Sequence, residues 1–502
     1  MAVCGIHIVK VMNNKLDRRR FLKTSVLATA SFSLFPARGA EVKATASATA
    51  RVVGANSDIR FAVIGFNGRG RDHLKELAAV KGTRLVALCD VDSNVLGREV
   101  DKCKTNGEQV EGYTDIRKLL ENKDIDAVTL ATPNHWHSLG SIWAVQAGKD
   151  VYVEKPVSHN VWEGRQLVKA ARQYGRIVQA GTQSRSSTGI AEGIAWLREG
   201  NIGKILRSRG LCYKRRASIG KVDGAQPIPA DIDYDLWCGP APKEPLMRKR
   251  LHYDWHWVWP TGNGDLGNQG IHEMDVARWV LGVNELSPRV LSVGGRLGYV
   301  DDGTTPNTLI VFHDYKPAPL IFEVRGLPAS DTNGKMDEYR GASIGIVTDC
   351  EGGSMVIPNY GSATIYDKEG KELKKFTGHS SHFENFVQAV RSRRHTDLKA
   401  DILEGHLSSA LCHTANISYR LGKTQSPEEI RATIKSDKDL AEALGRMEEH
   451  LAANKVDLQS APATLGAALN MDPQTERFND NAQANELLTR EYRKPFVVPD
   501  DV

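Results

Sequence analysis

The sequence predicts an α/β protein in which a doubly wound parallel sheet is followed by a second α/β domain with a mainly antiparallel sheet. Two observations predict this order. Short apolar runs alternate with helix-like stretches through the first third of the chain, as in a parallel sheet. Residues 290–366 instead alternate polar and apolar positions between Gly, Asp and Asn turns, as in an antiparallel sheet. The 502 residues are enough for two domains with full cores.

The first 50 residues are interpreted as a signal peptide and linker. Residues 17–23 read Asp-Arg-Arg-Arg-Phe-Leu-Lys, a weakly apolar stretch covers 24–35, and small residues crowd 37–50. This order is typical of a secretory signal, and the paired arginines resemble a twin-arginine signal. The alternative is a basic tail without export function. We expect an exported, periplasmic protein, and no apolar run is long enough for a membrane span in the mature chain.

Composition argues against several classes of function. The net charge is +5, and part of this excess lies in the leader, so it gives little reason to expect a nucleic-acid partner. The seven cysteines are scattered without a Cys-x-x-Cys pair. This spacing argues against a zinc site or a disulfide-dense scaffold, and we expect no metal.

Residues 59–70 carry the pattern of a dinucleotide site. An apolar run over 59–64 predicts a buried parallel strand, and a stretch with helical spacing covers 71–80. Between them, Asn67 replaces the middle glycine of the common G-x-G-x-x-G pattern. Glycines permit a tight turn, and backbone N–H groups at the helix start bind a pyrophosphate. We therefore expect cofactor contacts from Gly65, Asn67, Gly68, Arg69 and Gly70.

Asp90 follows the second predicted strand, 84–89, and lies 20 residues after Gly70. An acid at this place accepts hydrogen bonds from both ribose hydroxyls and repels a 2′-phosphate. No basic residue follows it in Val91-Asp92-Ser93. The sequence therefore favours NAD over NADP, and the alternative is a tight turn that binds no cofactor.

Polar segments follow three more predicted strands, at 128–131, 151–153 and 176–180. Ligands bind beyond the carboxyl ends of such strands. We therefore expect cofactor contacts from Thr132, Pro133, Asn134, His137, Glu154 and Lys155. The last of these segments adds two expected substrate contacts, Gln183 and Arg185.

These segments resemble the Gfo/Idh/MocA oxidoreductase family, which includes glucose–fructose oxidoreductase and inositol dehydrogenase. The resemblance rests on residues 59–70, 130–137, 151–156 and 262–275. It implies a Rossmann domain followed by an α/β domain with an open, mainly antiparallel sheet. It also implies a homo-oligomer, dimer or tetramer, formed through that sheet. We interpret the chain as a signal and linker (1–50), an NAD-binding Rossmann domain (51–183), a substrate and oligomerisation domain (184–425) and a C-terminal helical arm (426–502).

The resemblance further implies the catalytic residues. Lys155 would stand beside the nicotinamide and stabilise the alkoxide that develops on the reacting hydroxyl. In residues 262–275 the family's carboxylate and histidine, four residues apart on one helix face, fall on Asn268 and His272. His272 would be the general base, and its alternative is a structural histidine. Asn268 orients substrate but carries no charge, so Asp265 or Asp275 is the candidate to compensate.

The region before this segment holds candidate substrate contacts. The basic cluster 214–216 is either a solvated strand edge or a site for an anionic substrate such as a uronic acid or phosphosugar. The run 252–259, His-Tyr-Asp-Trp-His-Trp-Val-Trp, is either a sugar-binding surface or a core or interface cluster. We expect substrate contacts from Tyr213, His256, Trp257 and Asp265.

Three functions remain open. The first is an NAD-dependent oxidoreductase that oxidises or reduces a ring hydroxyl of a sugar or polyol, with cofactor held tightly because little free NAD exists outside the cytoplasm. The second is an NAD-dependent glycosidase that oxidises a hydroxyl, eliminates the aglycone, adds water and reduces again. It needs an extra base, for which Tyr213, His256 and Asp265 are candidates. The third is a non-catalytic sugar-binding module, against which Lys155 and His272 argue.

Overall fold

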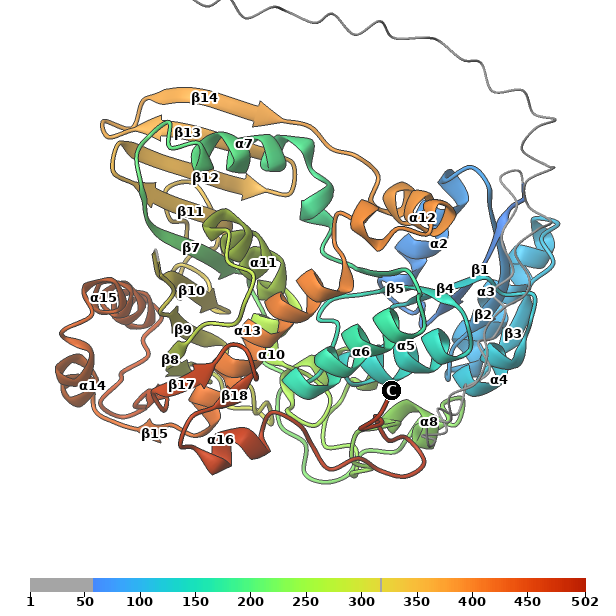
Figure 1. The fold of residues 1–502 in the computed structure, drawn as a ribbon. Helices are drawn as coiled ribbons and strands as arrows, with labels where there is room; N and C mark the ends of the chain where they lie inside the picture. Colours follow the sequence, from blue (N-terminus) through green and yellow to red (C-terminus); the bar gives the residue numbers. More distant parts are fainter. Residues whose placement is uncertain (1–56, 317) are drawn as a thin grey trace, which may run out of the picture. The chain divides into compact units, whose positions relative to one another are not determined.

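The computed structural model describes residues 57–316 and 318–502 (Figure 1). The predicted twin-arginine signal and its linker lie outside the described residues. No helix in the described part of the chain is both long and apolar enough to cross a membrane.

The first sheet is parallel and has the strand order β3-β2-β1-β4-β5-β6, which is the order of a Rossmann domain. Its strands are β1 (Ile59–Ile64), β2 (Thr83–Cys89), β3 (Glu111–Tyr113), β4 (Ala127–Leu130), β5 (Asp150–Val153) and β6 (Val178–Ala180). The intervening helices are α2 (Gly70–Ala79), α3 (Ser93–Thr105), α4 (Ile116–Glu121), α5 (His137–Gln146) and α6 (Val161–Gln173).

Helices cover both faces of this sheet (Figure 1). α2, α3 and α12 (His382–Ser392) pack on one face around Phe61 and Phe386. α4, α5, α6 and α13 (Ile402–Arg420) pack on the other face around Val128 and Leu167. Because the strands are enclosed on both sides, they are continuous apolar runs in the sequence.

The second sheet has the order β14-β13-β12-β11-β7-β10-β9-β8-β16-β15, and β17 also pairs with β8. Among its described neighbours β7 and β10 are parallel, and the other pairs are antiparallel. The predicted fold class is therefore confirmed. The strands are β7 (Ile205–Tyr213), β8 (Arg289–Gly295), β9 (Thr308–His313), β10 (Leu320–Arg325), β11 (Ile344–Cys350), β12 (Gly353–Asn359), β13 (Ser362–Asp367), β14 (Glu372–Thr377), β15 (Lys423–Thr424), β16 (Thr464–Leu465), β17 (Leu469–Asp472) and β18 (Arg477–Phe478).

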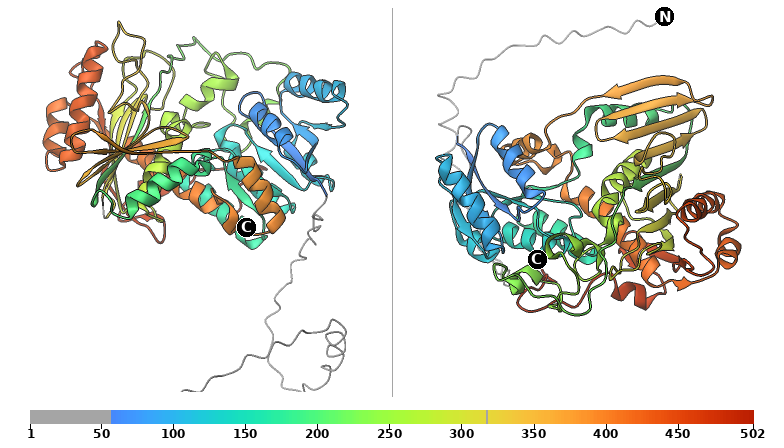
Figure 2. Two further views of the ribbon diagram at one scale, coloured as in Figure 1. Left: turned by 90° about the horizontal axis from the view of Figure 1, so that it is seen from above. Right: turned by 180° about the vertical axis from the view of Figure 1, so that it is seen from behind.

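Helices also cover both faces of the second sheet (Figure 2). α7 (Thr188–Arg198), α11 (Gly270–Leu281) and α13 pack on one face. α14 (Pro427–Ile434) and α15 (Lys438–Ala453) pack on the other face over β8, β9 and β10. The predicted helical arm thus also supplies strands, since β16 and β17 lie beside β8 and are followed by the short helix α16 (Ala482–Glu486).

The segment between β7 and α11 turns back towards the first sheet. It contains α8 (Tyr234–Cys238), α9 (Leu251–Asp254) and α10 (Gly264–Asn268). Ile232 forms an antiparallel bridge with Asp92, and the Asp233 N–H donates to the Val91 carbonyl at 3.1 Å. This segment therefore lies beside the carboxyl end of β2, on the side of the sheet where dinucleotides bind.

Candidate active site

The turn after β1 has two positions that only glycine fits. Gly65 has a φ of +75°, and a Cβ there would lie 2.9 Å from the backbone nitrogen of Thr132. A Cβ at Gly70, where α2 begins, would lie 2.1 Å from the carbonyl oxygen of Gly65. These contacts give the tight turn and the close approach of strand and helix that a dinucleotide site requires.

The start of α2 presents backbone donors to an anion. No side chain caps this helix, and Gly68 has open space where a Cβ would stand. Uncapped N–H groups and the positive end of the helix dipole fit a pyrophosphate. Asn67 replaces a glycine without strain, because Gly65 is the residue of this turn with a left-handed backbone.

Asp90 is a buried carboxylate held by backbone donors. Its Oδ2 accepts from the Phe66 N–H and its Oδ1 from the Asp92 N–H, each at 3.1 Å. Burial raises the pKa of Asp90, and these two hydrogen bonds lower it in part. Each oxygen keeps a further lone pair, so the carboxylate fits the two hydroxyls of an adenosine ribose.

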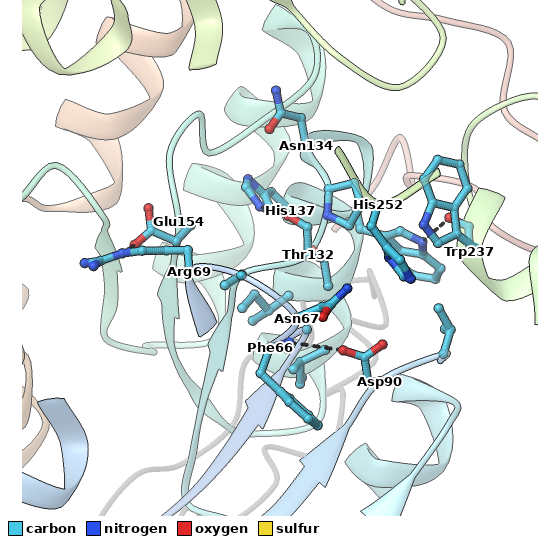
Figure 3. A pocket seen from close by; sticks show the side chains of 18 of the residues that line it. Phe66, Asn67, Arg69, Asp90, Thr132, Asn134, His137, Glu154, Trp237 and His252 are labelled. Atoms are coloured by element: carbon cyan, nitrogen blue, oxygen red, sulfur yellow. Dashed lines mark hydrogen bonds and ion pairs between the residues drawn. The ribbon is translucent and has the colours of Figure 1, made fainter. Parts of the chain in front are cut away.

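A cavity of about 520 Å³ connects these features, a size typical of cofactor pockets. Figure 3 shows Asn67 and Thr132 between the Arg69–Glu154 pair and the Asp90 carboxylate. Of the predicted cofactor residues, Gly70 alone does not line the cavity; those that do are Gly65, Asn67, Gly68, Arg69, Asp90, Thr132, Pro133, Asn134, His137, Glu154 and Lys155. The residues present therefore fit NAD.

Glu154 is fixed by three side-chain donors. Its Oε1 accepts from Arg69 Nε and His73 Nε2, each at 3.0 Å, and from Gln183 Nε2 at 3.1 Å. Burial alone raises the pKa of Glu154, but the His73 hydrogen bond and the charges of Arg69 and Lys155 bring it well below its usual range. Gln183, a predicted substrate contact, therefore positions this carboxylate and does not line the cavity.

Lys155 joins the two halves of the site. It follows Glu154 at the carboxyl end of β5, and its Nζ donates to the backbone oxygen of Asn268 at 2.8 Å. Burial lowers the pKa of Lys155, and the carboxylate of Glu154 opposes this shift. The hydrogen bond to Asn268 uses one of three ammonium donors, which leaves two for a ligand. Asn268 also lines the cavity.

Two neutral histidines lie within the field of the Lys155 charge. His256 lines the cavity, and its Nδ1 donates to the Tyr253 carbonyl at 2.5 Å, which leaves Nε2 as a proton acceptor. Burial lowers the pKa of His256 to about 3. His272, one helical turn beyond Asn268, is 7% exposed, and its Nδ1 has no hydrogen-bond partner within the described residues. Burial, aided by Lys155, also lowers the pKa of His272 well below its usual range.

Arg185 and Tyr213 were both predicted to bind substrate. Each is instead paired with another side chain of the protein. Arg185 is buried and pairs with Asp275, with an Nε–Oδ2 distance of 2.8 Å. The Tyr213 hydroxyl donates to Glu323 Oε2 at 2.6 Å. Neither residue lines the cavity.

Asp265 and Trp257, also predicted substrate contacts, share one partner. Both oxygens of Asp265 accept from Arg216, at 2.7 and 2.8 Å, and the Arg216 guanidinium lies 5.2 Å from the centre of the Trp257 ring. Since Asp265 and Asp275 are each paired with an arginine, neither supplies the free carboxylate that Asn268 lacks.

Two predicted cofactor residues also hold the site together. The His137 ring lies between the carbonyl oxygens of Pro156 (2.6 Å from Nδ1) and Thr132 (2.8 Å from Nε2). Asn134 Nδ2 donates to Asn263 Oδ1 at 3.1 Å. These contacts link the loops after β4 and β5 to the segment that leads into α10.

The opposite wall of the cavity was missed by the sequence analysis, which assigned no cofactor contact to it. It is formed by Leu236, Trp237, His252, Tyr253 and Trp255. His252 Nε2 donates to Asp92 Oδ2 at 2.9 Å, which ties this wall to the strand end that carries Asp90. The aromatic run 252–259 was the available signal, but it was assigned to the substrate.

Two family descriptions match successive parts of the chain. Residues 59–182 match the Gfo/Idh/MocA oxidoreductase family with its NAD-binding Rossmann fold, and residues 204–311 match the C-terminal alpha/beta domain of the same oxidoreductase family. These two segments belong to the Gfo/Idh/MocA family. The first is therefore an NAD-binding Rossmann domain.

Curated relatives of this chain match over part of their length. A glycosyl hydrolase family 109 protein of Shewanella pealeana is 34% identical over 171 residues, which are 32% of this chain and 38% of that one. The inositol 2-dehydrogenase of Salmonella paratyphi B is 29% identical over 157 residues, which are 31% of this chain and 46% of that one. The chain thus spans less than half the length of these relatives.

A solved structure shows the same fold. The WlbA dehydrogenase from Bordetella pertussis, in complex with NADH and UDP-GlcNAcA, aligns with a TM-score of 0.53 and 18% sequence identity. The alignment covers 71% of this chain and 96% of that one.

Proposed function

We propose that this protein is an NAD-dependent oxidoreductase that oxidises or reduces a ring hydroxyl of a sugar or polyol by hydride transfer. The observation that carries this proposal is the position of Lys155. Lys155 lines the cofactor cavity, and its ammonium donates to the backbone oxygen of Asn268 at the α10–α11 junction. A substrate hydroxyl bound there would meet both the Rossmann domain and the helices of the second domain.

The chain's own residues supply the proton chemistry. When bound, NAD accepts or returns the hydride at its nicotinamide ring. The two free donors of Lys155 bind the reacting oxygen and stabilise its developing negative charge. His256 lines the cavity with a free Nε2 and is neutral at pH 7, so its imidazole accepts the hydroxyl proton. His272, the base expected from the sequence, is also neutral but does not line this cavity. The Asn268 side chain, which lines the cavity, orients a second hydroxyl.

The experiment that tests this proposal begins with the cofactor. The mature protein is purified without added nucleotide and denatured, and any released nicotinamide dinucleotide is identified. Near-stoichiometric NAD, together with absorbance at 340 nm on adding sugars or polyols, is the expected result. Protein that contains no NAD and does not bind added NAD would overturn the proposal.

An NAD-dependent glycosidase is the second candidate function. One observation favours it: of the three candidate extra bases, His256 lines the cavity with a free Nε2, whereas Tyr213 and Asp265 are held by Glu323 and Arg216. The partial match to a glycosyl hydrolase family 109 protein points the same way. A glycoside that is cleaved without net change in NAD oxidation state would establish this function, whereas a stable ketone product would establish the oxidoreductase.

Export and assembly are further parts of the proposal. The Arg-Arg-Arg-Phe-Leu-Lys run at residues 18–23 supports twin-arginine export to the periplasm, with NAD bound before transport. The family resemblance supports a homo-oligomer. Cell fractionation of the full chain, with a variant in which Arg18, Arg19 and Arg20 are replaced by Lys, tests export. Light scattering of the purified protein tests the oligomer.

A further inference from the structure

A second lysine that the proposed reaction does not use contacts the residue next to Asn268. Lys214, in the segment after β7, donates from Nζ to Gln269 Oε1 at 2.6 Å. Lys155 donates to the backbone of Asn268. Two ammonium groups are thus anchored on consecutive residues, and neither forms an ion pair with any carboxylate of the described residues.

The carboxylates around these two lysines are already neutralised. Glu154 is held by Arg69 and His73, and Asp265 by Arg216. Glu273 is 1% exposed, and burial raises its pKa to about 8, so that it is mostly uncharged at pH 7. The surroundings of Lys155 and Lys214 at the α10–α11 junction therefore carry an excess of positive charge.

A chain of polar groups runs from Lys214 to a partly exposed tyrosine. Gln269 Nε2 donates to the Tyr360 hydroxyl at 2.6 Å, and the Tyr360 and His272 rings lie 5.2 Å apart. Tyr360, in the turn between β12 and β13, is 40% exposed. Two buried atoms of this cluster, His272 Nδ1 and Glu273 Oε2, have no hydrogen-bond partner within the described residues.

The basic cluster 214–216 resolves into three different roles. Arg216 neutralises Asp265, and Arg215 is exposed. Lys214 alone contacts the α10–α11 junction beside the candidate catalytic residues. The sequence left open whether this cluster is a solvated strand edge or an anion site. Of its three residues, Lys214 is the candidate for the anion site.

We propose, on the basis of the function proposed above, that the substrate is a sugar acid whose carboxylate is bound by Lys214 and the Tyr360 hydroxyl. Lys155 is committed to the reacting hydroxyl, so one ammonium and one hydroxyl remain for the anionic group. This donor set matches the single charge and two oxygens of a carboxylate. A dianionic phosphate prefers more donors and the fork of an arginine.

The test compares ligands that differ in charge. Binding of D-glucuronate, its methyl ester and D-glucose to the NAD-loaded protein is measured by calorimetry, independently of turnover. D-Glucuronate is expected to bind at least 10-fold more tightly than the two neutral ligands. Equal or weaker binding of D-glucuronate overturns the inference. Tighter binding of glucose 6-phosphate than of D-glucuronate overturns the assignment to a carboxylate.

Matched variants locate the charge that selects the ligand. Lys214→Met is expected to reduce the affinity ratio of D-glucuronate to D-glucose by about 10-fold to 100-fold. Arg215→Met removes the neighbouring exposed charge and is expected to leave this ratio within about twofold. If both variants change the ratio equally, the selectivity comes from the general field of the surface and Lys214 is not its source.

The same measurements separate the two proposals. If D-glucuronate binds with the expected preference but no sugar changes the oxidation state of NAD, the inference stands and the proposed oxidoreductase fails. If neutral sugars alone bind and reduce NAD, the oxidoreductase stands and the sugar-acid inference fails.

Discussion

Two buried carboxylates, one in each domain, show how differently the two halves of the site are built. Asp90, in the Rossmann domain, is 9% exposed and accepts hydrogen bonds from two backbone N–H groups. Asp265, in the second domain, is 2% exposed, and both of its oxygens are bound by Arg216. Asp90 keeps lone pairs for a ligand, whereas the charge of Asp265 is satisfied within the protein.

The difference extends to the surrounding residues. On the cofactor side, Asp90 is held by backbone N–H groups and Lys155 donates to a backbone oxygen, so both keep hydrogen-bonding capacity for a ligand. Most substrate-side charges are closed into ion pairs, as with Arg185 and Asp275. A charged residue near a site is therefore available to a ligand only when its hydrogen-bonding capacity exceeds what the fold uses.

The largest effect is expected from replacing Lys155, which links the cofactor side of the site to the substrate side. Lys155→Ala removes the ammonium that stabilises the reacting oxygen, so kcat is expected to fall by about 10²-fold to 10⁴-fold. NAD content after purification should stay near that of the unaltered protein. Lys169→Ala, at an exposed lysine of α6, is the matched control for loss of one positive charge. Turnover within tenfold of the unaltered enzyme would refute the role of Lys155.

Breaking the Arg216–Asp265 ion pair on the substrate side should lower the stability of the fold. Arg216→Ala leaves the Asp265 carboxylate buried without its partner, which is expected to cost about 3–5 kcal/mol of folding free energy. The thermal unfolding midpoint, measured by calorimetry, records this loss. The double variant Arg216→Met, Asp265→Leu removes both charges and should recover most of the midpoint. An unchanged midpoint in Arg216→Ala would contradict a structural role.

Replacing the buried carboxylate on the cofactor side, Asp90, should weaken the binding of NAD. Asp90→Ser is expected to raise the Kd of NAD by about 10-fold to 100-fold, because a charged hydrogen-bond acceptor for the ribose is lost. Its unfolding midpoint should fall less than that of Arg216→Ala. Fluorescence titration with NADH measures the first quantity. Unchanged affinity would mean that Asp90 does not contact the cofactor.

The smallest effect concerns the pH dependence of stability. The pKa of Glu273 is about 8 in the folded protein because the side chain is buried. Since this value lies above the ordinary one, the folded state retains a proton that the unfolded state loses. The contribution of Glu273 to stability is therefore complete below about pH 4.5 and is lost as the pH rises to about 8.

Glu273→Gln, which removes this titration, provides the measurement. The midpoint of the variant relative to that of the unaltered protein should rise by about 2 °C between pH 5 and pH 8. Glu369→Gln, at an exposed acid, is the control and should show no such trend. A constant difference across this range would mean that Glu273 titrates near its ordinary pKa.

The order of the parallel strands, the glycine turn and Asp90 were predictable from the sequence. Each depends on neighbours along the chain: a buried strand, a turn that requires glycine and a polar residue at the strand end occur within one β–α–β unit. Thr132 and Lys155, which the same reasoning selected, line the cavity. The antiparallel order of the second sheet was predicted from the Gly, Asp and Asn turns, but its central strands β9 and β10 are buried along their whole length because helices cover both faces.

Which side chains face the substrate was decided by the tertiary structure. Arg185 and Asp275 are separated by 90 residues, Arg216 and Asp265 by 49, and Lys155 and Asn268 by 113. A charged residue has the same appearance in the sequence whether its partner is a ligand or a distant side chain. The sequence therefore determined the cofactor half through local geometry. Only long-range pairing separated Lys214 from Arg216, since Arg216 is bound by Asp265 whereas Lys214 forms no ion pair with the described residues.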